Sequence, residues 1–120
     1  MKARRWKTKI ENACRAAGTY REFFGDTVNA LAMILERRDT AYKEWEEQGF
    51  PLTADYTNKN GATNTTEHPM LKVWKDLNGE ALTFWRDLGL TPAGLKKINE
   101  NAMKKKKESG LAAALRDLNG

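Results

Sequence analysis

Residues 67–92 read Glu-His-Pro-Met-Leu-Lys-Val-Trp-Lys-Asp-Leu-Asn-Gly-Glu-Ala-Leu-Thr-Phe-Trp-Arg-Asp-Leu-Gly-Leu-Thr-Pro, and this stretch decides the fold. Pro69 suits the first turn of a helix, because its missing N–H would have no partner there. Gly89 suits a left-handed stop at the other end. Thr91 followed by Pro92 then predicts the cap and the first position of a new helix. The stretch therefore predicts one complete helix and the start of the next.

Apolar residues recur along this helix at three- and four-residue steps. They are Met70, Trp74, Leu77, Ala81, Phe84 and Leu88. Such a stripe is too rich for a short helix surrounded by water, so it must face another element. The expected partner is a long helix from about Thr27 to Gln48, capped by Asp26. Its heptad-like seam is broken once by Arg38, and its acidic residues, Glu36 and Asp39 among them, are expected on a solvated surface.

The segment between these helices, residues 50–66, changes character. Leu52, Ala54 and Tyr56 alternate with polar residues, and Asn60-Gly61 favours a tight hairpin turn. The return arm is small and polar. A two-stranded hairpin alone is marginal in water, so this segment either stays mobile or pairs with a neighbour.

Basic helices are expected at both ends of the chain. Residues 2–17 predict a helix stopped by Gly18, and Thr19 with Glu22 predicts a capping box for a short turn. The helix that starts at Pro92 runs into four adjacent lysines, and Gly110 is expected to interrupt it before a short amphipathic end.

The fold class predicted from these elements is all-α. A long antiparallel helical hairpin is closed by a polar loop with β-hairpin character and flanked by basic terminal segments. The expected organisation is a basic N-terminal helix (1–18), a helical-hairpin oligomerisation core (19–98) and a lysine-rich C-terminal segment (99–120).

The two helices of the hairpin carry a large aromatic load for a chain of 120 residues. One apolar face would remain exposed in a single copy, so we expect a homo-oligomer larger than a dimer. The residues expected at the oligomer interface are Val28, Leu31, Leu35, Trp45, Trp74, Phe84 and Trp85.

The net charge of +5 is unevenly distributed. Residues 1–15 and residues 96–107 each hold six basic side chains and one acidic one, whereas residues 16–95 hold eight basic and twelve acidic. A chain that is acidic in the middle and basic toward both ends is typical of a polyanion binder. The residues expected to contact DNA are Lys2, Arg4, Arg5, Lys7, Lys9, Lys104, Lys105, Lys106 and Lys107.

Several kinds of chemistry are missing from the sequence. No glycine loop for phosphate is followed by Lys-Ser or Lys-Thr, and no Cys or His cluster has metal spacing. The single histidine, His68, precedes a helix-starting proline and is expected to act as a cap or turn residue rather than in proton transfer. Cys14 has no second cysteine to pair with and is expected to be a buried or half-buried thiol. We therefore expect no enzyme activity, no catalytic residue, no metal and no cofactor. No membrane partner is expected either, because no apolar run approaches about 18 residues.

The order of these elements resembles the small terminase subunit of tailed bacteriophages. The resemblance rests on a helix ending at Glu47-Gln48-Gly49, a polar turn, His68-Pro69, a striped helix and Leu-Gly-Leu-Thr-Pro at 88–92. It covers roughly residues 20–98. It implies a ring that recognises double-stranded viral DNA in the host cell cytoplasm and delivers it to the large motor and nuclease subunit.

Two other functions remain open from the residues alone. A stand-alone transcriptional regulator would need a compact helix–turn–helix, but the first 25 residues hold at most one helix and a short turn. A structural adaptor of the phage head would bind only protein.

Overall fold

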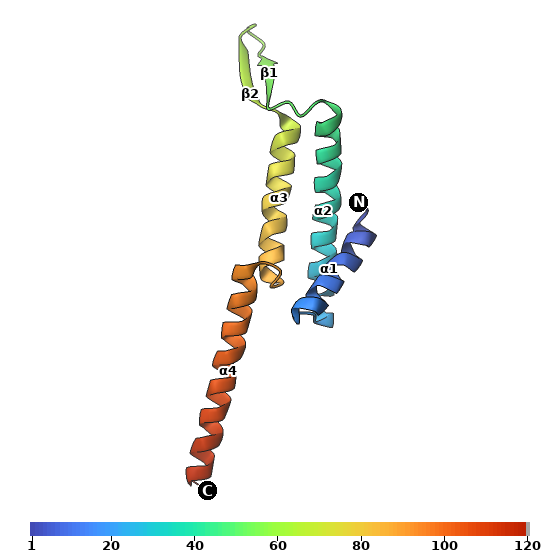
Figure 1. Cartoon of the computed structure of the whole chain (residues 1–120). Coiled ribbons are helices and arrows are strands. Elements are labelled where there is room, and N and C mark those ends of the chain that lie inside the picture. The colour runs from blue at the N-terminus through green and yellow to red at the C-terminus, as the bar shows by residue number, and fades with distance from the viewer. Residues whose placement is uncertain (120) are drawn as a thin grey trace.

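The computed structural model describes residues 1–119. The elements in chain order are α1 (Ala3–Ala17), the 3₁₀ turn η1 (Glu22–Phe24), α2 (Gly25–Glu47), β1 (Thr53–Thr57), β2 (Thr63–Glu67), α3 (Pro69–Asp87) and α4 (Pro92–Asn119). The molecule is elongated, with principal extents of 84 × 31 × 21 Å (Figure 1). Gly120, the last residue of the expected C-terminal segment, lies outside the described residues.

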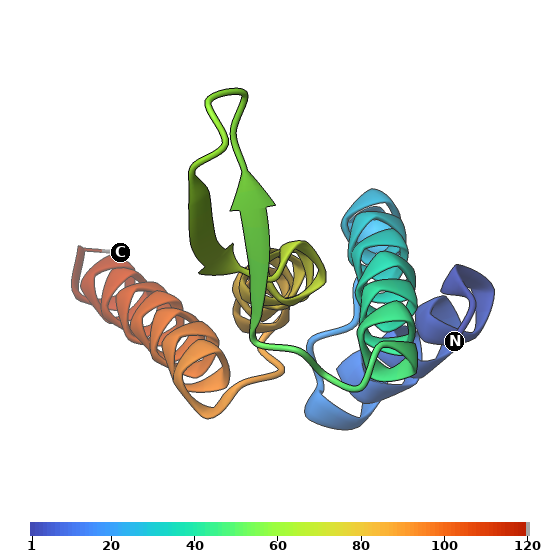
Figure 2. The same cartoon turned by 90° about the horizontal axis from the view of Figure 1, so that it is seen from above.

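The expected helical hairpin is confirmed: α2 and α3 lie antiparallel and side by side (Figures 1 and 2). The stripe on α3 faces α2, and Ala81 and Leu88 are its most buried members. The prediction of a mostly helical fold with a small hairpin loop therefore holds.

α1 completes the core by crossing the N-terminal half of α2. Its Trp6 indole also meets Trp85 of α3 edge to face, with ring centroids 6.4 Å apart. The buried side chains from the three helices form one cluster. Its members are Trp6, Ile10, Cys14, Val28, Leu31, Ala32, Leu35, Ala81 and Leu88.

Most of the predicted helix ends are confirmed. Gly18 and Gly89 end α1 and α3 with φ of 74° and 73°. His68 Nδ1 accepts a hydrogen bond from the Met70 N–H at 3.2 Å, so His68 is a cap residue, as expected. Thr91 Oγ1 likewise accepts from the Gly94 N–H at 3.0 Å.

The predicted start of α2 is wrong. η1 runs directly into α2, so the residue before α2, Phe24, has φ −82° and ψ 4° rather than the extended backbone that lets a side chain cap. Asp26 therefore lies in the first turn and does not cap the helix, although its charge there suits the helix dipole. The Thr19–Glu22 capping box is also absent, because the Thr19 hydroxyl bonds the Cys14 carbonyl instead.

The β-hairpin between the long helices is confirmed, but its turn is longer than predicted. The strands pair antiparallel from Thr53 opposite Glu67 to Thr57 opposite Thr63, which leaves residues 58–62 as the loop. Asn58 Oδ1 accepts hydrogen bonds from the N–H groups of Asn60 and Ala62, both at 3.0 Å. Backbone hydrogen bonds from Asn58 N–H to the Ala62 carbonyl and from Gly61 N–H to the Asn58 carbonyl close the same loop. A five-residue loop, rather than a two-residue turn, therefore reverses the chain.

The expected interruption at Gly110 is wrong, because α4 continues through it as one helix. A single glycine costs a helix only about 1 kcal/mol, and Leu111, Ala112, Ala113 and Ala114 directly after it are strong helix formers. α4 points away from the hairpin (Figure 1), and residues 96–116 are all exposed.

Truncating the core should be costly. Leu35→Ala is expected to lower the free energy of unfolding by about 2–5 kcal/mol, because Leu35 is fully buried and a cavity would replace it. Urea denaturation at one fixed protein concentration measures the change. The control is Leu82→Ala on α3, where the side chain is 48% exposed. Equal losses of stability for the two variants would contradict the assignment of Leu35 to the core.

Candidate nucleic-acid interface

α1 turns its apolar residues inward and leaves its basic residues exposed. Trp6, Ile10 and Cys14 recur every four residues and are buried against α2 and α3. The five basic residues predicted to contact DNA here lie outside this buried stripe and, at about 100° per residue, spread over most of the remaining circumference; all are exposed. They are Lys2, Arg4, Arg5, Lys7 and Lys9.

Two carboxylates of α2 hold the start of α1 in place. The Ala3 N–H donates to Glu36 Oε2 at 2.6 Å, and the Trp6 indole N–H donates to Asp39 Oδ2 at 2.7 Å. The Met1 amino group also lies 3.2 Å from Asp39 Oδ2. The expectation that Glu36 and Asp39 belong to an ordinary solvated surface is therefore wrong, since both orient α1.

Asp39 is stabilised as a carboxylate by these contacts. Burial alone would raise the pKa of Asp39. The hydrogen bonds from Trp6 and the Met1 amino group, together with the positive charges of Met1 and Arg38, outweigh that effect and hold the pKa below its usual value.

The contacts of Arg38 explain why a charged residue interrupts the apolar seam of α2. Its guanidinium lies 5.6 Å from the centroid of the Trp6 ring and donates to Asp39 Oδ1 at 3.3 Å and to Asn78 Oδ1 at 3.3 Å. Arg38 thus links α1, α2 and α3 at the rim of the core.

The basic side chains of α1 are available to an external partner. Among the described residues, no carboxylate forms an ion pair with the side chains of the five exposed basic residues of α1. Lys9 instead rests over the Trp6 ring, with Nζ 5.0 Å from the centroid. Basic side chains that form no ion pair can bind phosphate without first breaking one.

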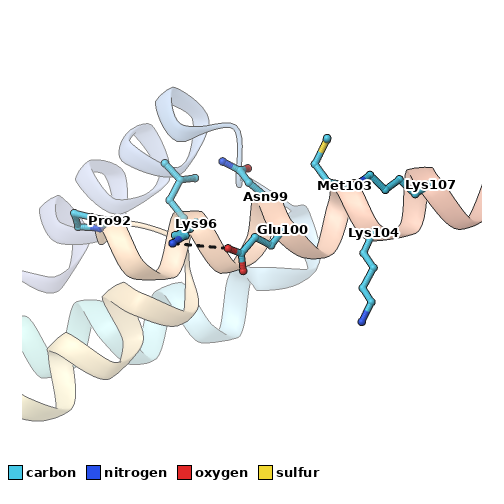
Figure 3. Close-up of a pocket in the computed structure, with 8 residues that line it drawn as sticks. Pro92, Lys96, Asn99, Glu100, Met103, Lys104 and Lys107 are labelled. Carbon is cyan, nitrogen blue, oxygen red and sulfur yellow. Dashed lines mark ion pairs between the residues drawn. The ribbon is translucent and has the colours of Figure 1, made fainter.

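The lysines at 104–107 lie on a part of α4 that is wholly exposed. They occupy consecutive positions of α4, and steps of about 100° spread them around the helix instead of along one face. Lys104 and Lys107 share one open face of α4 with the apolar side chains of Leu95 and Met103 (Figure 3). Nearby, Lys96 and Glu100 form an exposed ion pair at 3.9 Å.

The fold does not bring the two basic segments together. The C-terminal end of α1 lies near the start of α4, where Ala17 and Pro92 line a common pocket. α1 then runs along α2, whereas α4 points away from the hairpin, so the basic segments at their far ends are separated (Figures 1 and 2). One copy of the chain therefore presents two separate basic surfaces.

A family model described as phage terminase, small subunit, matches residues 3–105. The chain belongs to the small-subunit family of phage terminases. No curated protein and no solved structure matches it. The matched range spans α1, the helical hairpin and the first half of α4, so the basic α1 is part of the family unit.

The predicted interface residues of this small terminase subunit fall into two groups. Val28, Leu31 and Leu35 lie inside the core of one chain, and a neighbouring copy could reach them only if that core opened. The other four are half-buried: Trp45, Trp74, Phe84 and Trp85. Phe84 and Trp85 pack against the core.

Trp45 and Trp74 form an aromatic cluster at the end of the helical hairpin that carries the β-hairpin. The Trp45 and Trp74 rings lie 6.1 Å apart, and Tyr42 and Phe50 join them. The Trp45 indole N–H donates to the Pro51 carbonyl at 2.7 Å and so ties the end of α2 to the loop.

The other chemistry of this terminase subunit is limited. Among residues whose side chains are described, no three His, Cys, Asp or Glu residues gather where they could hold a metal ion. Cys14 is buried, which raises the pKa of its thiol, as expected for a core residue. Within the described chain, no helix is long and apolar enough to cross a membrane.

The anchoring of α1 should depend on pH. Because the folded pKa of Asp39 is depressed, its charge adds stability above the unfolded pKa, and this contribution is lost as pH falls through about 4 and below. Asp39→Asn keeps an acceptor for Trp6 but removes the charge. Urea denaturation from neutral to acid pH should therefore show the wild type and this variant converging.

The control for this titration is Asp87→Asn, which alters an exposed carboxylate of α3. It removes one exposed carboxylate and leaves the contacts of Asp39 in place. A constant gap between the wild type and Asp39→Asn would show that the charge of Asp39 does not hold α1.

Proposed function

We propose that this small terminase subunit binds double-stranded viral DNA and delivers it to the large subunit, which supplies the motor and nuclease activities. It works in the host cell cytoplasm as a homo-oligomeric ring and is not itself an enzyme. Its role in phage genome packaging follows from the family. Beyond that role, we propose the recognition of DNA, its delivery to the large subunit and the assembly of the ring.

The observation that carries this proposal is the basic outer face of α1. The helix is held by buried contacts on one side and, among the described residues, its five outward basic side chains are free of ion pairs on the other. Positive charge favours DNA binding because each phosphate contact releases counterions, and a rigid support lowers the conformational entropy lost on binding. α1 supplies both.

We assign a second DNA contact to Lys104–Lys107. Four adjacent lysines repel one another, so a polyanion would stabilise this part of α4. Lysines bind phosphate as point charges and carry little base information. Affinity per copy would be weak at this surface, and a ring would raise it through avidity.

The ring is supported by exposed apolar surface on the helical hairpin. A groove of about 520 Å³ runs between α2 and α3, with Ala41, Val73 and Leu77 in its lining. The β-hairpin next to it has two unpaired edges, and its strands are almost wholly exposed. A cyclic assembly needs two different patches on each copy, and these features supply candidates.

DNA binding can be tested one surface at a time. Arg4→Ala with Arg5→Ala, and separately Lys104 to Lys107 changed to alanine, should each weaken binding. The slope of log affinity against log salt should flatten by about 0.9 for each phosphate that the variant no longer neutralises. Fluorescence anisotropy with one labelled duplex at several salt concentrations measures both effects.

A matched control changes Lys43 and Lys72 to alanine; both are exposed, on α2 and α3, away from both surfaces. This control should leave the slope unchanged. An unchanged slope for the Lys104–Lys107 variant would remove α4 from the DNA-binding surface, and absence of binding by the wild type would reject the function.

The oligomer is expected to exceed a dimer at micromolar concentration. Val73→Asp should shift the population toward smaller species, because an unpaired charge in an apolar interface is costly. The side chain is 39% exposed in one copy, so the helical fold should survive the change. Native mass spectrometry gives the masses, with Thr83→Asp on the same helix as the control. A monomeric wild type would contradict the ring.

A further inference from the structure

The centre of the outer face of α1 combines one basic residue with two uncharged polar residues. Arg5, Thr8 and Asn12 are spaced by three and four residues, so they share one strip of the helix. All three are exposed, and the strip lies opposite the buried Trp6, Ile10 and Cys14. We call these three residues the reading strip.

We propose that α1 enters the major groove of DNA and that the reading strip recognises base sequence, with Asn12 as its central specificity-determining residue. This inference rests on the proposed DNA binding and adds to it the element that distinguishes one sequence from another.

The position of the charges supports insertion into a groove. With about 100° per residue, Arg4 lies roughly 70° to one side of the reading strip and Lys9 roughly 70° to the other. Basic side chains on both flanks can contact the phosphates of both strands while the strip between them faces the bases. With its side chains an α-helix such as the 15-residue α1 is about 10–12 Å across, which fits a major groove about 12 Å wide.

The side chain of Asn12 is oriented before DNA arrives. Arg15 Nη1 donates to Asn12 Oδ1 at 3.2 Å. The Arg15 guanidinium is itself fixed, because it lies 4.3 Å from the centroid of the Tyr20 ring and 3.9 Å from a Glu11 carboxylate oxygen. A surface asparagine held in this way loses less conformational freedom on binding. The amide oxygen keeps a second lone pair for a base.

The residue types match base edges. Arginine pairs with guanine and asparagine with adenine through two hydrogen bonds each, and a threonine methyl group can contact the methyl group of thymine. The Thr8 hydroxyl already bonds the Arg4 carbonyl at 3.4 Å, which leaves the methyl group for such a contact. A helix that bound only phosphate would gain more from lysine than from threonine or asparagine at the centre of its outer face.

The test is a selection with the full chain. Short duplexes with a randomised centre are bound by the wild type and sequenced, and affinities are then measured for the enriched duplex and a scrambled one at one salt concentration. The wild type should enrich a short motif. Asn12→Ala should lose the preference at one position, with the affinity ratio of the two duplexes falling roughly ten-fold.

Two control variants separate base reading from general binding. Asn99→Ala removes an exposed asparagine of α4 and should retain the motif. Lys9→Ala should weaken binding to both duplexes alike and keep their ratio. Circular dichroism of each variant checks that α1 remains folded, which is expected because Asn12 is exposed.

The outcomes distinguish this inference from the proposed function. A wild type that binds DNA but enriches no motif, or an Asn12→Ala variant with the wild-type motif and ratio, would reject the reading strip and leave DNA binding intact. A wild type that binds no DNA would reject both.

Discussion

The Trp6 indole is the contact on which the presentation of α1 depends. Burying this ring places α1 across α2 and against Trp85 of α3, but it also removes a polar N–H from water. Asp39 accepts that N–H, and the partly buried carboxylate is in turn balanced by Arg38 and the Met1 amino group. Asp39 thus provides the hydrogen bond that the buried Trp6 N–H requires, and Arg38 and the Met1 amino group provide the positive charge that Asp39 requires. The outward direction of the basic residues is a geometric consequence of this inward contact, because the helix cannot turn without withdrawing the indole.

The ends of α3 were predictable because they depend on local chemistry. Pro69 suits a first helical turn and Gly89 a left-handed stop whatever the rest of the fold, and Thr91 directly before Pro92 marks the start of α4 in the same local way. The cap of α2 was not predictable in the same way. Asp26 is a good cap in isolation, but α2 begins earlier because η1 feeds directly into it. The continuity of α4 through Gly110 shows the opposite case, where neighbouring helix formers outweigh one unfavourable residue.

The candidate site was predictable in composition but not in arrangement. The basic residues of α1 could be named from the charge pattern. The roles of Glu36 and Asp39 depend on which helix crosses α2 and on the position along α2 where it crosses. Apolar periodicity likewise identified Val28, Leu31 and Leu35 as residues that must be covered. It did not say whether the cover comes from the same chain or from another copy, and here α1 and α3 provide it. Periodicity reports a need for burial, and only the three-dimensional contacts assign the partner.

Core contacts stabilise α1 and the helical hairpin but not the outer part of α4, so stabilisation of that part must come from a binding partner. The core fastens α1 to the helical hairpin, whereas the outer part of α4 has Met103, Leu111 and Leu115 exposed beside its lysines. An isolated helix gains little stability in water, and adjacent lysines reduce it further. DNA can neutralise the lysines but offers little apolar surface along its backbone, whereas a protein can cover the leucines. A protein partner and the proposed DNA contact would therefore meet two different needs of the same helix, and α4 is the element through which protein binding and DNA binding would influence each other.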